Sequence, residues 1–415
     1  MLLNRERLKD FMKKYDVDAL VLSYYPNVAY ATDFECAWLY KNHKEYMLHP
    51  GASANSLQAN AILPLDRDPI LVASTTVTGF TQGIWVKNVR TIGNASADLS
   101  LKDSLKNIDD EMKRVRKIWQ SDRKPNNAET IASVIKDLGL ENAVLGIDIE
   151  GMPVETQTAL RSMLPDASLK NCCELVRLIR MVKSDEEISR LGKAAEIAEK
   201  AAIESVNEMR PGMHIGEAAQ VFNEKVAKGG AIFDHYFYSR SGLELCGYPD
   251  WKLERGHSLY LDFGCMYRMY FSDSGFTVMV GPIEESLLKT YDALRETMSD
   301  TLEKVRPGVR PSALAQTMQE LLRKRGIGTN QGQGHGIGIE PRDYPIISEN
   351  LQGTVSDGFV HVSVDIPLEK GMVINLEIPY FKFGVGSFHL ERTVSVTDNG
   401  YSDLTIQDRG RPLKI

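Results

Sequence analysis

The chain has 415 residues, of which 43% are hydrophobic and 25% are charged, and its formal net charge is −7 at pH 7. This balance is typical of a soluble globular protein long enough for two domains, and it excludes a disordered or fibrous chain. The sequence has no long basic run, so it lacks the electrostatic footprint of a nucleic-acid-binding protein. We therefore expect a small or neutral substrate and no nucleic-acid partner.

The sequence predicts neither a membrane span nor a disulfide framework. No stretch reaches the roughly 18 uninterrupted apolar residues of a membrane-spanning helix, and residues 1–15 have the pattern of an amphipathic helix instead of a signal peptide. The cysteines are odd in number and form no C-x-x-C pair, so we expect free thiols in a cytoplasmic protein without a membrane partner. They are Cys36, Cys172, Cys173, Cys246 and Cys265.

The first part of the chain alternates predicted helices and strands. Residues 4–15 have the pattern of a helix, and four short apolar runs have the pattern of strands, at 18–23, 59–65, 69–74 and 143–149. This alternation is typical of an α/β domain, which we place at residues 1–170. Residues 24–49 are rich in Tyr, Trp and His, and a loop of that composition is either a binding surface or a partly buried rim.

The second part, residues 171–415, repeats one arrangement of elements. Ser184 and Glu187 have the spacing of a capping box, which opens a helix predicted to run to residue 209. An Arg-Pro-Gly sequence at 210–212 ends that helix and a second helix follows, and the same order recurs around Arg-Pro-Gly at 306–308. Strands bearing two acids follow each helix pair. The sequence therefore predicts an internally duplicated domain with approximate two-fold symmetry.

In the first half of this domain, residues 258–264 alternate as a strand. Leu261 and Phe263 share the packing face, while Asp262 points to the opposite face. A turn near residues 264–269 then returns the chain through Asp273. If the two strands form a hairpin, Asp262 and Asp273 lie on the same face, close enough to share an ion.

The second half supplies Glu377, on the strand face of Asn375, and Glu391, on the face of His389, while His335 lies in a glycine-rich segment between the halves. An unpaired buried carboxylate costs on the order of several kcal/mol, so these acids require a cation. Four carboxylates and one imidazole suit two divalent cations of the Mn, Fe, Co or Zn type. Taken singly, a strand Asp is more often a turn residue or a salt-bridge partner, and a lone His among glycines is more often a loop histidine.

Together these motifs resemble those of the creatinase/prolidase/methionine aminopeptidase family, the M24-type metallohydrolases with a pita-bread catalytic domain. The segments that carry the resemblance are Asp262-Phe-Gly, Ser-Asp273, Gly-His335-Gly-Ile-Gly, the strand ending at Glu377, and Leu-Glu391-Arg-Thr-Val. Residues 25–34 and 178–188 also resemble the N-terminal domain and the domain junction of prolidases and aminopeptidases P. The resemblance implies an α/β N-terminal domain at 1–170 and an α+β pita-bread domain with internal pseudo-two-fold duplication at 171–415.

By that resemblance, Asp262 binds one of two metal ions, His335 and Glu377 bind the other, and Asp273 and Glu391 bridge them. Glu377 also handles the proton of the attacking metal-bridged hydroxide. The implied reaction is hydrolysis of an amide or peptide-like C–N bond in a small carboxylated or dipeptide-like substrate. The resemblance further implies a homodimer in which the N-terminal domain of one subunit covers the active site of the other, with residues 24–49 as the candidate roof.

The positions that recognise the substrate depart from the peptidase pattern. Arg342 stands where family peptidases usually have a second histidine, and Tyr248 lies where they have another, with His235 and His257 nearby. His389 stands in place of an Arg, and Gly275-Phe276 in place of Thr-Arg. We therefore expect an enzyme that is similar to Xaa-Pro peptidases but is not an ordinary prolidase.

Arg342, His235 and Tyr248 are the substrate-binding candidates. His389, together with Glu377, is a catalytic candidate that either supplies a proton or only orients a carboxylate.

Two other functions stay open at this point. One is a metal-dependent lyase of the same fold that cleaves dimethylsulfoniopropionate, because residues 342–345 loosely resemble a motif of those lyases, although the strand of Asp262 differs from theirs. The other is a metal-free binding protein, since some pita-bread proteins have lost their metals. The presence of all five expected ligands favours an enzyme.

Overall fold

The computed structural model describes residues 1–42, 58–93, 108–121, 123–240, 242, 251–328, 332–383, 386–405 and 411–415. The chain forms two compact units, Met1–Arg180 with Val355–His361, and Met181–Thr354 with Val362–Ile415. The domain boundary at residue 170 stays a prediction, and the two units divide after Arg180. Helix α7 (Cys173–Arg180) belongs to the first unit, where the N–H of Leu175 donates to Asp357 at 2.9 Å.

The first unit contains a mixed six-stranded sheet in the order β4-β3-β2-β1-β5-β6. The strands are β1 (Ala19–Leu22), β2 (Ala59–Pro64), β3 (Ile70–Ser74), β4 (Asn88–Ile92), β5 (Val144–Ile147) and β6 (Ser168–Asn171). The three strands β1, β2 and β3 are buried along their whole length, as is expected when elements cover both faces of a sheet. Ile131 and Ile135 of helix α5 (Asn127–Asp137) pack with Val21, Ile62 and Leu160 in one core.

The helices of this unit are α1 (Arg5–Lys14), α2 (Tyr25–Thr32), α3 (Ala37–Asn42), η1 (Thr75–Thr81), α4 (Asp110–Trp119), α5 (Asn127–Asp137), α6 (Val154–Met163) and α7. The expectation of a loop over residues 24–49 is wrong for the part that the structure describes. Every residue of α2 is buried, with a proline in its first turn, so this aromatic segment contributes to the core. Residues 43–49 lie outside the described residues.

The second unit consists of two halves with the same order of elements. The first half contains α8 (Asp185–Glu208), α9 (Ile215–Lys228), β7 (Ile232–Ser239), β8 (Ser258–Tyr267), β9 (Tyr270–Phe271) and β10 (Ser274–Met279). The second half contains α10 (Glu285–Leu302), α11 (Pro311–Lys324), β11 (Gln333–Gly336), β12 (Asp343–Ile347), β15 (Val373–Lys382), β16 (Gly386–Val396) and β17 (Tyr401–Asp403). The short strands β13 (Thr354–Ser356) and β14 (His361–Ser363) pair with each other, and β18 (Leu413–Lys414) ends the chain.

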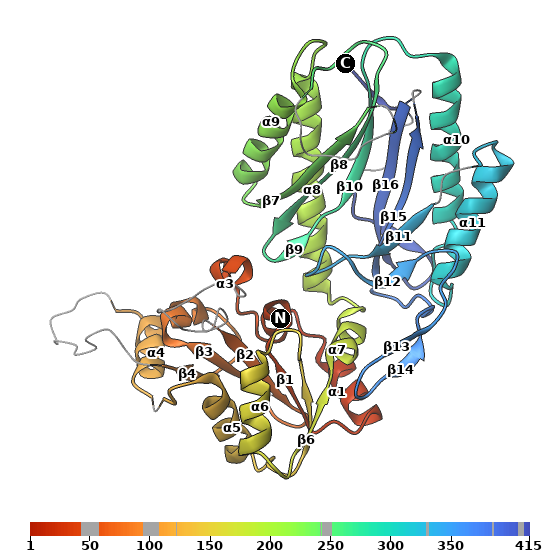
Figure 1. Ribbon diagram of the computed structural model, residues 1–415. Helices are drawn as coiled ribbons and strands as arrows, with labels where there is room; N and C mark the ends of the chain where they lie inside the picture. Colours follow the sequence, from red (N-terminus) through yellow and green to blue (C-terminus); the bar gives the residue numbers. More distant parts are fainter. Residues whose placement is uncertain are drawn as a thin grey trace. The chain divides into compact units, whose positions relative to one another are not determined.

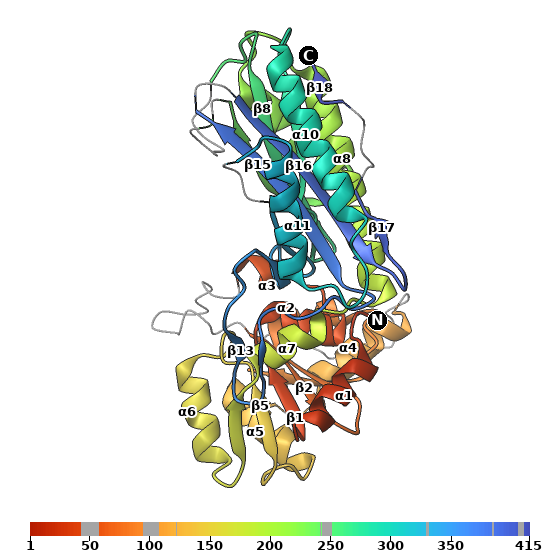
Figure 2. The same ribbon diagram turned by 90° about the vertical axis from the view of Figure 1, so that its right-hand side faces the viewer.

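Each half has its own sheet, in the order β18-β10-β8-β7 for the first and β12-β11-β15-β16-β17 for the second. Helices α8 and α9 pack on β8 and β7, and α10 and α11 pack on strands of the second sheet, as Figure 1 and Figure 2 show. Alanines on one side of α8, among them Ala198 and Ala202, allow close approach to Leu261 and Phe263 of β8. The predicted packing face of this strand is therefore confirmed.

The turn that follows β8 is shorter than the one predicted at residues 264–269. Strand β8 continues to Tyr267, which pairs with Tyr270, so Arg268 and Met269 form a two-residue hairpin loop. Both have positive φ, 46° and 74°, which is the backbone that the right-handed twist of a hairpin requires. Gly264 lies inside the strand, and the true turn has Arg-Met in place of the Asn-Gly or Asp-Gly pair that would mark it.

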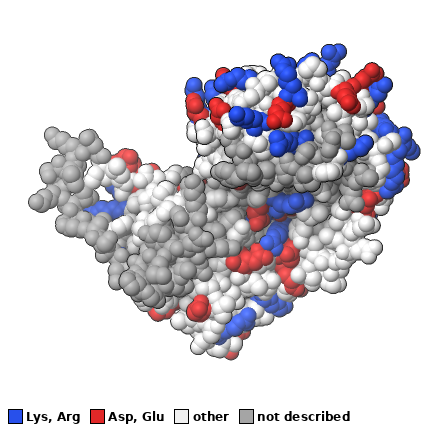
Figure 3. Space-filling model, turned by 45° about the horizontal axis from the view of Figure 1, so that its top comes forward, with Lys and Arg blue, Asp and Glu red and all other residues white. Residues whose placement is uncertain are grey.

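Charged side chains of both signs lie next to one another on the face of the molecule shown in Figure 3. Among the described residues, no helix is long and apolar enough to cross a membrane. Cys36, Cys172, Cys173 and Cys265 are buried free thiols. Cys246 lies outside the described residues.

Candidate metal centre

The strand register places the four predicted acids in two pairs, and the members of each pair lie on neighbouring segments of one sheet. Asp262 of β8 pairs with Gly275 of β10, and Asp273 comes directly before β10, so the two aspartates are diagonal neighbours. Glu377 of β15 lies directly opposite Glu391 of β16. Because side chains directly opposite each other in an antiparallel pair share a face, each half presents two carboxylates on one face of its sheet.

Polar side chains join the two sheets beside these acids. Thr277 Oγ1 on β10 accepts a hydrogen bond from the N–H of His389 on β16, at 2.9 Å, and lies 2.9 Å from its carbonyl oxygen. The carbonyl oxygen of Asp273 accepts hydrogen bonds from Asn375 Nδ2 and Thr393 Oγ1, both at 3.1 Å. These bonds fix the strand of Asp273 against the strands of the two glutamates.

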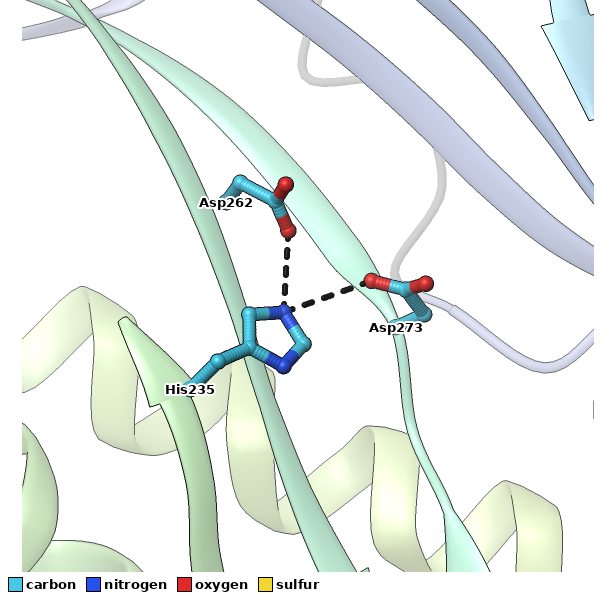
Figure 4. A group of neighbouring side chains, drawn as sticks. All are labelled: His235, Asp262 and Asp273. Carbon is cyan, nitrogen blue, oxygen red and sulfur yellow. Dashed lines mark hydrogen bonds and ion pairs between the residues drawn. The ribbon is translucent and has the colours of Figure 1, made fainter. Parts of the chain in front are cut away.

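Two imidazoles contact the carboxylate of Asp273. His335 lies on strand β11, not in a loop, and its Nε2 is 3.4 Å from Asp273 Oδ2, while its Nδ1 is 2.9 Å from the carbonyl oxygen of Gly336. His235 on β7 places Nε2 2.9 Å from Asp262 Oδ1 and 3.4 Å from Asp273 Oδ1 (Figure 4). Its Nδ1 is 2.8 Å from Asp234 Oδ2.

His389 lies fully buried on the other side of the acids. Its ring stacks on Tyr260, with centroids 3.9 Å apart and planes 7° from parallel. Its Nδ1 is 3.1 Å from the carbonyl oxygen of Leu261, so in the neutral ring Nδ1–H donates there and Nε2 is directed to the acids. That nitrogen lies 3.6 Å from Glu391 Oε2 and 3.8 Å from Glu377 Oε2, beyond hydrogen-bond distance.

The carboxyl groups of the centre differ strongly in pKa. Burial, followed by the charges of Asp273, Asp262 and Glu377, raises the pKa of Glu391 well above its usual range. Burial acts in the same direction on Asp273, but hydrogen bonds from His235 and His335 outweigh it and hold the pKa of Asp273 well below its usual range. Protons are thus distributed very unequally among neighbouring carboxyl groups.

This donor set fits divalent metal ions. Glu391 Oε2 is buried and has no hydrogen-bond partner among the residues that the structure describes, although it points into a cluster of other carboxylates. A buried carboxylate in that position requires a compensating cation. Two groups of three ligand atoms lie within 4.8 Å of one another, His235 with Asp262 and Asp273, and Asp262 with His389 and Glu391. Carboxylate oxygen and imidazole nitrogen together are ligands of Mn, Fe, Co and Zn ions.

The structure thus brings most of the predicted site residues together, but not all. Asp262, Asp273, His335, Glu377 and Glu391 converge, and His235 and His389 lie among them. Arg342 is exposed, and its neighbour Asp343 is buried with Oδ2 4.0 Å from Lys183 Nζ. Tyr248 lies outside the described residues.

Three residues that the sequence analysis did not select also belong to the centre. Tyr260 stacks on His389, Asp234 holds His235, and Gln333 Nε2 donates to Glu377 Oε1 at 3.1 Å. Tyr260 shares the strand face of Asp262 by simple alternation, and that pattern is enough to find it. Gln333 precedes His335 by two residues and is found in the same way, whereas no sequence pattern marks Asp234.

Comparison with known proteins gives the family. The sequence profile of metallopeptidase family M24 matches residues 189–398, and that of the creatinase/prolidase N-terminal domain matches residues 4–182. A Xaa-Pro dipeptidase of Pyrococcus horikoshii is 28% identical over 282 residues, which cover 66% of this chain and 74% of that protein. A creatinase of Bacillus sp. (strain B-0618) is 23% identical over 416 residues, which cover 96% of this chain and 89% of the creatinase.

Solved structures agree in fold. The prolidase from Pyrococcus furiosus superimposes with a TM-score of 0.69 at 21% identity, covering 97% of this chain and 100% of that chain. The X-Pro aminopeptidase from Thermotoga maritima gives 0.68 at 19% identity, covering 99% of both chains. The family resemblance and the two-domain fold expected from the motifs are confirmed. The chain is therefore a metallohydrolase that belongs to metallopeptidase family M24 and carries a creatinase/prolidase N-terminal domain.

Proposed function

We propose that this metallohydrolase cleaves an amide or peptide-like C–N bond in a small carboxylated substrate, with a specificity different from that of an ordinary Xaa-Pro dipeptidase. The observation that carries the proposal is the buried acidic cluster in which Glu391 Oε2 finds no hydrogen-bond partner in the described part of the chain. The Xaa-Pro dipeptidases among the relatives support a dipeptide-like substrate. The buried ring of His389 beside Glu391 supports altered recognition, because it fills space next to the acids.

In this proposal two divalent ions, of the Mn, Fe, Co or Zn type, are held by the five predicted ligands. Asp262 would hold one ion, His335 and Glu377 the other, and Asp273 and Glu391 both. When bound, such ions activate water near neutral pH and polarise the scissile carbonyl group. The two aspartates come from one half of the second unit and the two glutamates from the other, so both halves are needed to complete the centre.

Glu377 is the residue that we assign to proton transfer. Its Oε1 accepts the hydrogen bond from Gln333, while Oε2 faces His389 Nε2. Gln333 therefore fixes the carboxylate and leaves Oε2 to take a proton from water and deliver it to the leaving nitrogen. His389 would exchange that proton through Nε2, because its Nδ1 is engaged with the carbonyl oxygen of Leu261.

Arg342 is the proposed contact for the substrate carboxylate. Its side chain is exposed, and it lies close enough to His335 to act on it electrostatically. A guanidinium binds a carboxylate through two parallel hydrogen bonds, which an ammonium does not reproduce. Arg342→Lys is therefore expected to raise KM about tenfold or more at unchanged folding, since one charge-assisted hydrogen bond is worth about 1.5–3 kcal/mol.

The matched control is Arg323→Lys, at an arginine that is 58% exposed and lies 3.5 Å from Glu349. Steady-state kinetics on metal-reconstituted protein, with Xaa-Pro dipeptides, other dipeptides and small carboxylated amides, measures the effect. If KM is the same for Arg342→Lys and for the unaltered protein, Arg342 does not bind the carboxylate.

The same assay separates the rival functions. Hydrolysis of an amide substrate supports the proposal, whereas release of dimethyl sulfide from dimethylsulfoniopropionate without amide hydrolysis would assign the chain to the lyases. If the protein shows neither activity and binds no divalent ion, the remaining hypothesis is a metal-free binding protein. The homodimer, its roof over the partner's site and the cytoplasmic location stay predictions, which size-exclusion chromatography with light scattering and cell fractionation can test.

A further inference from the structure

A β-bulge in strand β7 brings His235 to the metal centre. Phe233 pairs with Cys265 and His235 pairs with Gly264, so Asp234 is an additional residue on β7. Neighbouring side chains on a regular strand point to opposite faces, but a bulge redirects them. Here Asp234 and His235 contact each other instead, with Asp234 Oδ2 2.8 Å from His235 Nδ1.

The partner strand leaves space for the His235 ring. A Cβ atom on Gly264 would lie 2.5 Å from His235 Cε1 and 2.3 Å from the carbonyl oxygen of Ser272, so no larger residue fits there without a shift. On its other side the ring stacks on Phe237, with centroids 5.2 Å apart. The side chain of His235 is 14% exposed. The ring is therefore held in one position by its surroundings.

The two ring nitrogens have different partners. Nδ1 lies against the carboxylate of Asp234, which is outside the acidic cluster, while Nε2 faces Asp262 and Asp273 together (Figure 4). Without a metal ion, Nε2–H donates to these carboxylates. When an ion is bound, a neutral imidazole that donates Nδ1–H to Asp234 would offer the lone pair of Nε2 to that ion. A histidine whose outer nitrogen is held by a carboxylate, and whose inner nitrogen faces further ligands, is the usual arrangement of a metal-binding histidine.

Asp273 connects this histidine to His335. Its Oδ1 lies 3.4 Å from His235 Nε2, and its Oδ2 lies 3.4 Å from His335 Nε2. The Nδ1 atom of His335 is also held by an acceptor, the carbonyl oxygen of Gly336. The two histidines thus occupy equivalent positions at the two oxygens of one carboxylate.

The separations fit shared coordination. Ligand atoms that each lie about 2.1 Å from one ion, at angles of about 90–110°, are separated by about 3.0–3.4 Å. The distances from His235 Nε2 to Asp262 Oδ1 and Asp273 Oδ1 are 2.9 and 3.4 Å. One ion therefore fits these three atoms with little movement of the side chains.

We propose that His235 Nε2 is a ligand of the metal ion held by Asp262 and Asp273, so that each of the two ions has one imidazole ligand. This inference rests on the metal centre of the proposed function, and it replaces the substrate-binding role expected for His235. Asp234 is the positioning residue that holds the ring. Because imidazole favours Zn, Co and Fe over Mn, the nitrogen ligand selects later transition metals at this position.

The test compares His235→Phe with the unaltered chain. Phenylalanine keeps a ring against Phe237 and carries no ligand atom. Full-length protein is stripped with a chelator and titrated with Co²⁺, followed by calorimetry and by the visible absorption of the bound ion. We expect two Co²⁺ per chain in the unaltered protein. In His235→Phe the affinity for one of them should fall at least tenfold with a change in its absorption bands, and the affinity for Mn²⁺ should fall less.

The matched control is His257→Phe, whose ring is 26% exposed and 3.6 Å from Glu254; its Co²⁺ affinities should be unchanged. Asp234→Asn keeps the ligand but weakens its orientation, so it should lower the affinity for the same ion about tenfold. If circular dichroism shows that His235→Phe does not fold, the affinity of Asp234→Asn for this ion tests the proposal instead.

The outcomes separate this inference from the proposed function. Two bound ions in the unaltered protein, with the same affinities and spectra in both the His235 and the Asp234 variants, would overturn the assignment of His235 and leave the proposed metal centre intact. No divalent ion bound by the unaltered protein would overturn both.

Discussion

Gly275 and His389 depend on each other at the scale of single residues. A Cβ atom on Gly275 would lie 2.1 Å from His389 Nδ1 and 2.5 Å from Cε1. The ring of Tyr260 stacks on His389 at a centroid distance of 3.9 Å. The imidazole therefore has space at this position only because residue 275 has no side chain. The two departures from the peptidase motifs, at 275 and at 389, thus have one steric explanation.

Gly275→Ala is expected to displace the His389 ring and to destabilise the protein by about 1–3 kcal/mol, the usual cost of overpacking a buried position. Because Nε2 of His389 faces Glu377 and Glu391, the substitution should also lower kcat/KM with any substrate found. Urea unfolding and steady-state kinetics measure the two effects.

Gly328→Ala is the control, since an added Cβ there meets no described residue within 4 Å; its stability should change by no more than about 0.5 kcal/mol. If the steric explanation holds, Gly275→Ala should cost much less in a His389→Ala background, because the clashing ring is gone. Equal costs in both backgrounds would show that the two residues are independent.

At the scale of elements, helices α8 and α9 begin with the same capping contact, but the capping glutamate is buried in one helix and exposed in the other. Glu187 accepts a hydrogen bond from the N–H of Ser184 at 2.8 Å, and Glu217 accepts one from the N–H of His214 at 3.1 Å. Glu187 is 2% exposed and also accepts from the hydroxyl of Tyr270, whereas Glu217 is exposed. Burial raises the pKa of Glu187 to about 7 from its ordinary value of 4.5.

This shift predicts a pH dependence of stability. The folded protein binds the proton of Glu187 more tightly than the unfolded chain does, so the contribution is full below about pH 4.5 and is lost as the pH rises through about 7. Its size is on the order of 3 kcal/mol. Glu187→Gln does not titrate, so the free energy of unfolding of this variant relative to the unaltered protein should rise by roughly that amount between about pH 5 and pH 8.

Urea unfolding at the two pH values measures the difference. Glu217→Gln makes the same substitution at the exposed capping glutamate of α9 and is the matched control. A relative stability of Glu187→Gln that does not change with pH would mean that Glu187 is ionised in the folded protein throughout.

The elements themselves show what a sequence can predict. The capping box at Ser184, the helix stop at residues 210–212 and the alternation around Asp262, Glu377 and Glu391 are local patterns, and all of them appear in the structure. The second predicted stop is displaced, because α10 ends at Leu302, before the Arg-Pro-Gly sequence at 306–308. Strands β4 and β6 were not predicted, because neither has a continuous apolar run and both lie at the edges of their sheet. Burial of α2 depends on what covers it, which no local pattern contains.

The same reasoning explains the incomplete prediction of the site. Four carboxylates and His335 follow from motifs and alternation. The orientation of His235 depends on a bulge that displaces Asp234 from the regular alternation, and a bulge changes the register without a clear signal in the sequence. The contact of Gly275 with His389 joins strands that are distant in the chain, so only the packing of the two sheets reveals it.

At the scale of the whole molecule, the candidate centre lies entirely in the second unit and draws on both of its halves. The aspartates come from the sheet of β8 and β10, and the glutamates from the sheet of β15 and β16. Divalent ions shared by these acids would connect the two sheets and remove the repulsion between them. Metal binding should therefore stabilise the second unit directly.

Removal of metal is expected to destabilise the second unit and to leave the stability of the first unit unchanged. Ions at about 100 times their Kd stabilise the state that binds them by about 2.7 kcal/mol. Stripping the protein with a chelator should therefore accelerate amide hydrogen exchange by up to about 100-fold in β8, β10, β11, β15 and β16, where exchange follows the opening equilibrium. Exchange in β1, β2 and β3, which belong to the first unit's own core, serves as the internal control. Equal acceleration in both units would show that the metal does not stabilise the second unit selectively. An unchanged exchange pattern would argue that the charges of the acids are compensated without a metal ion.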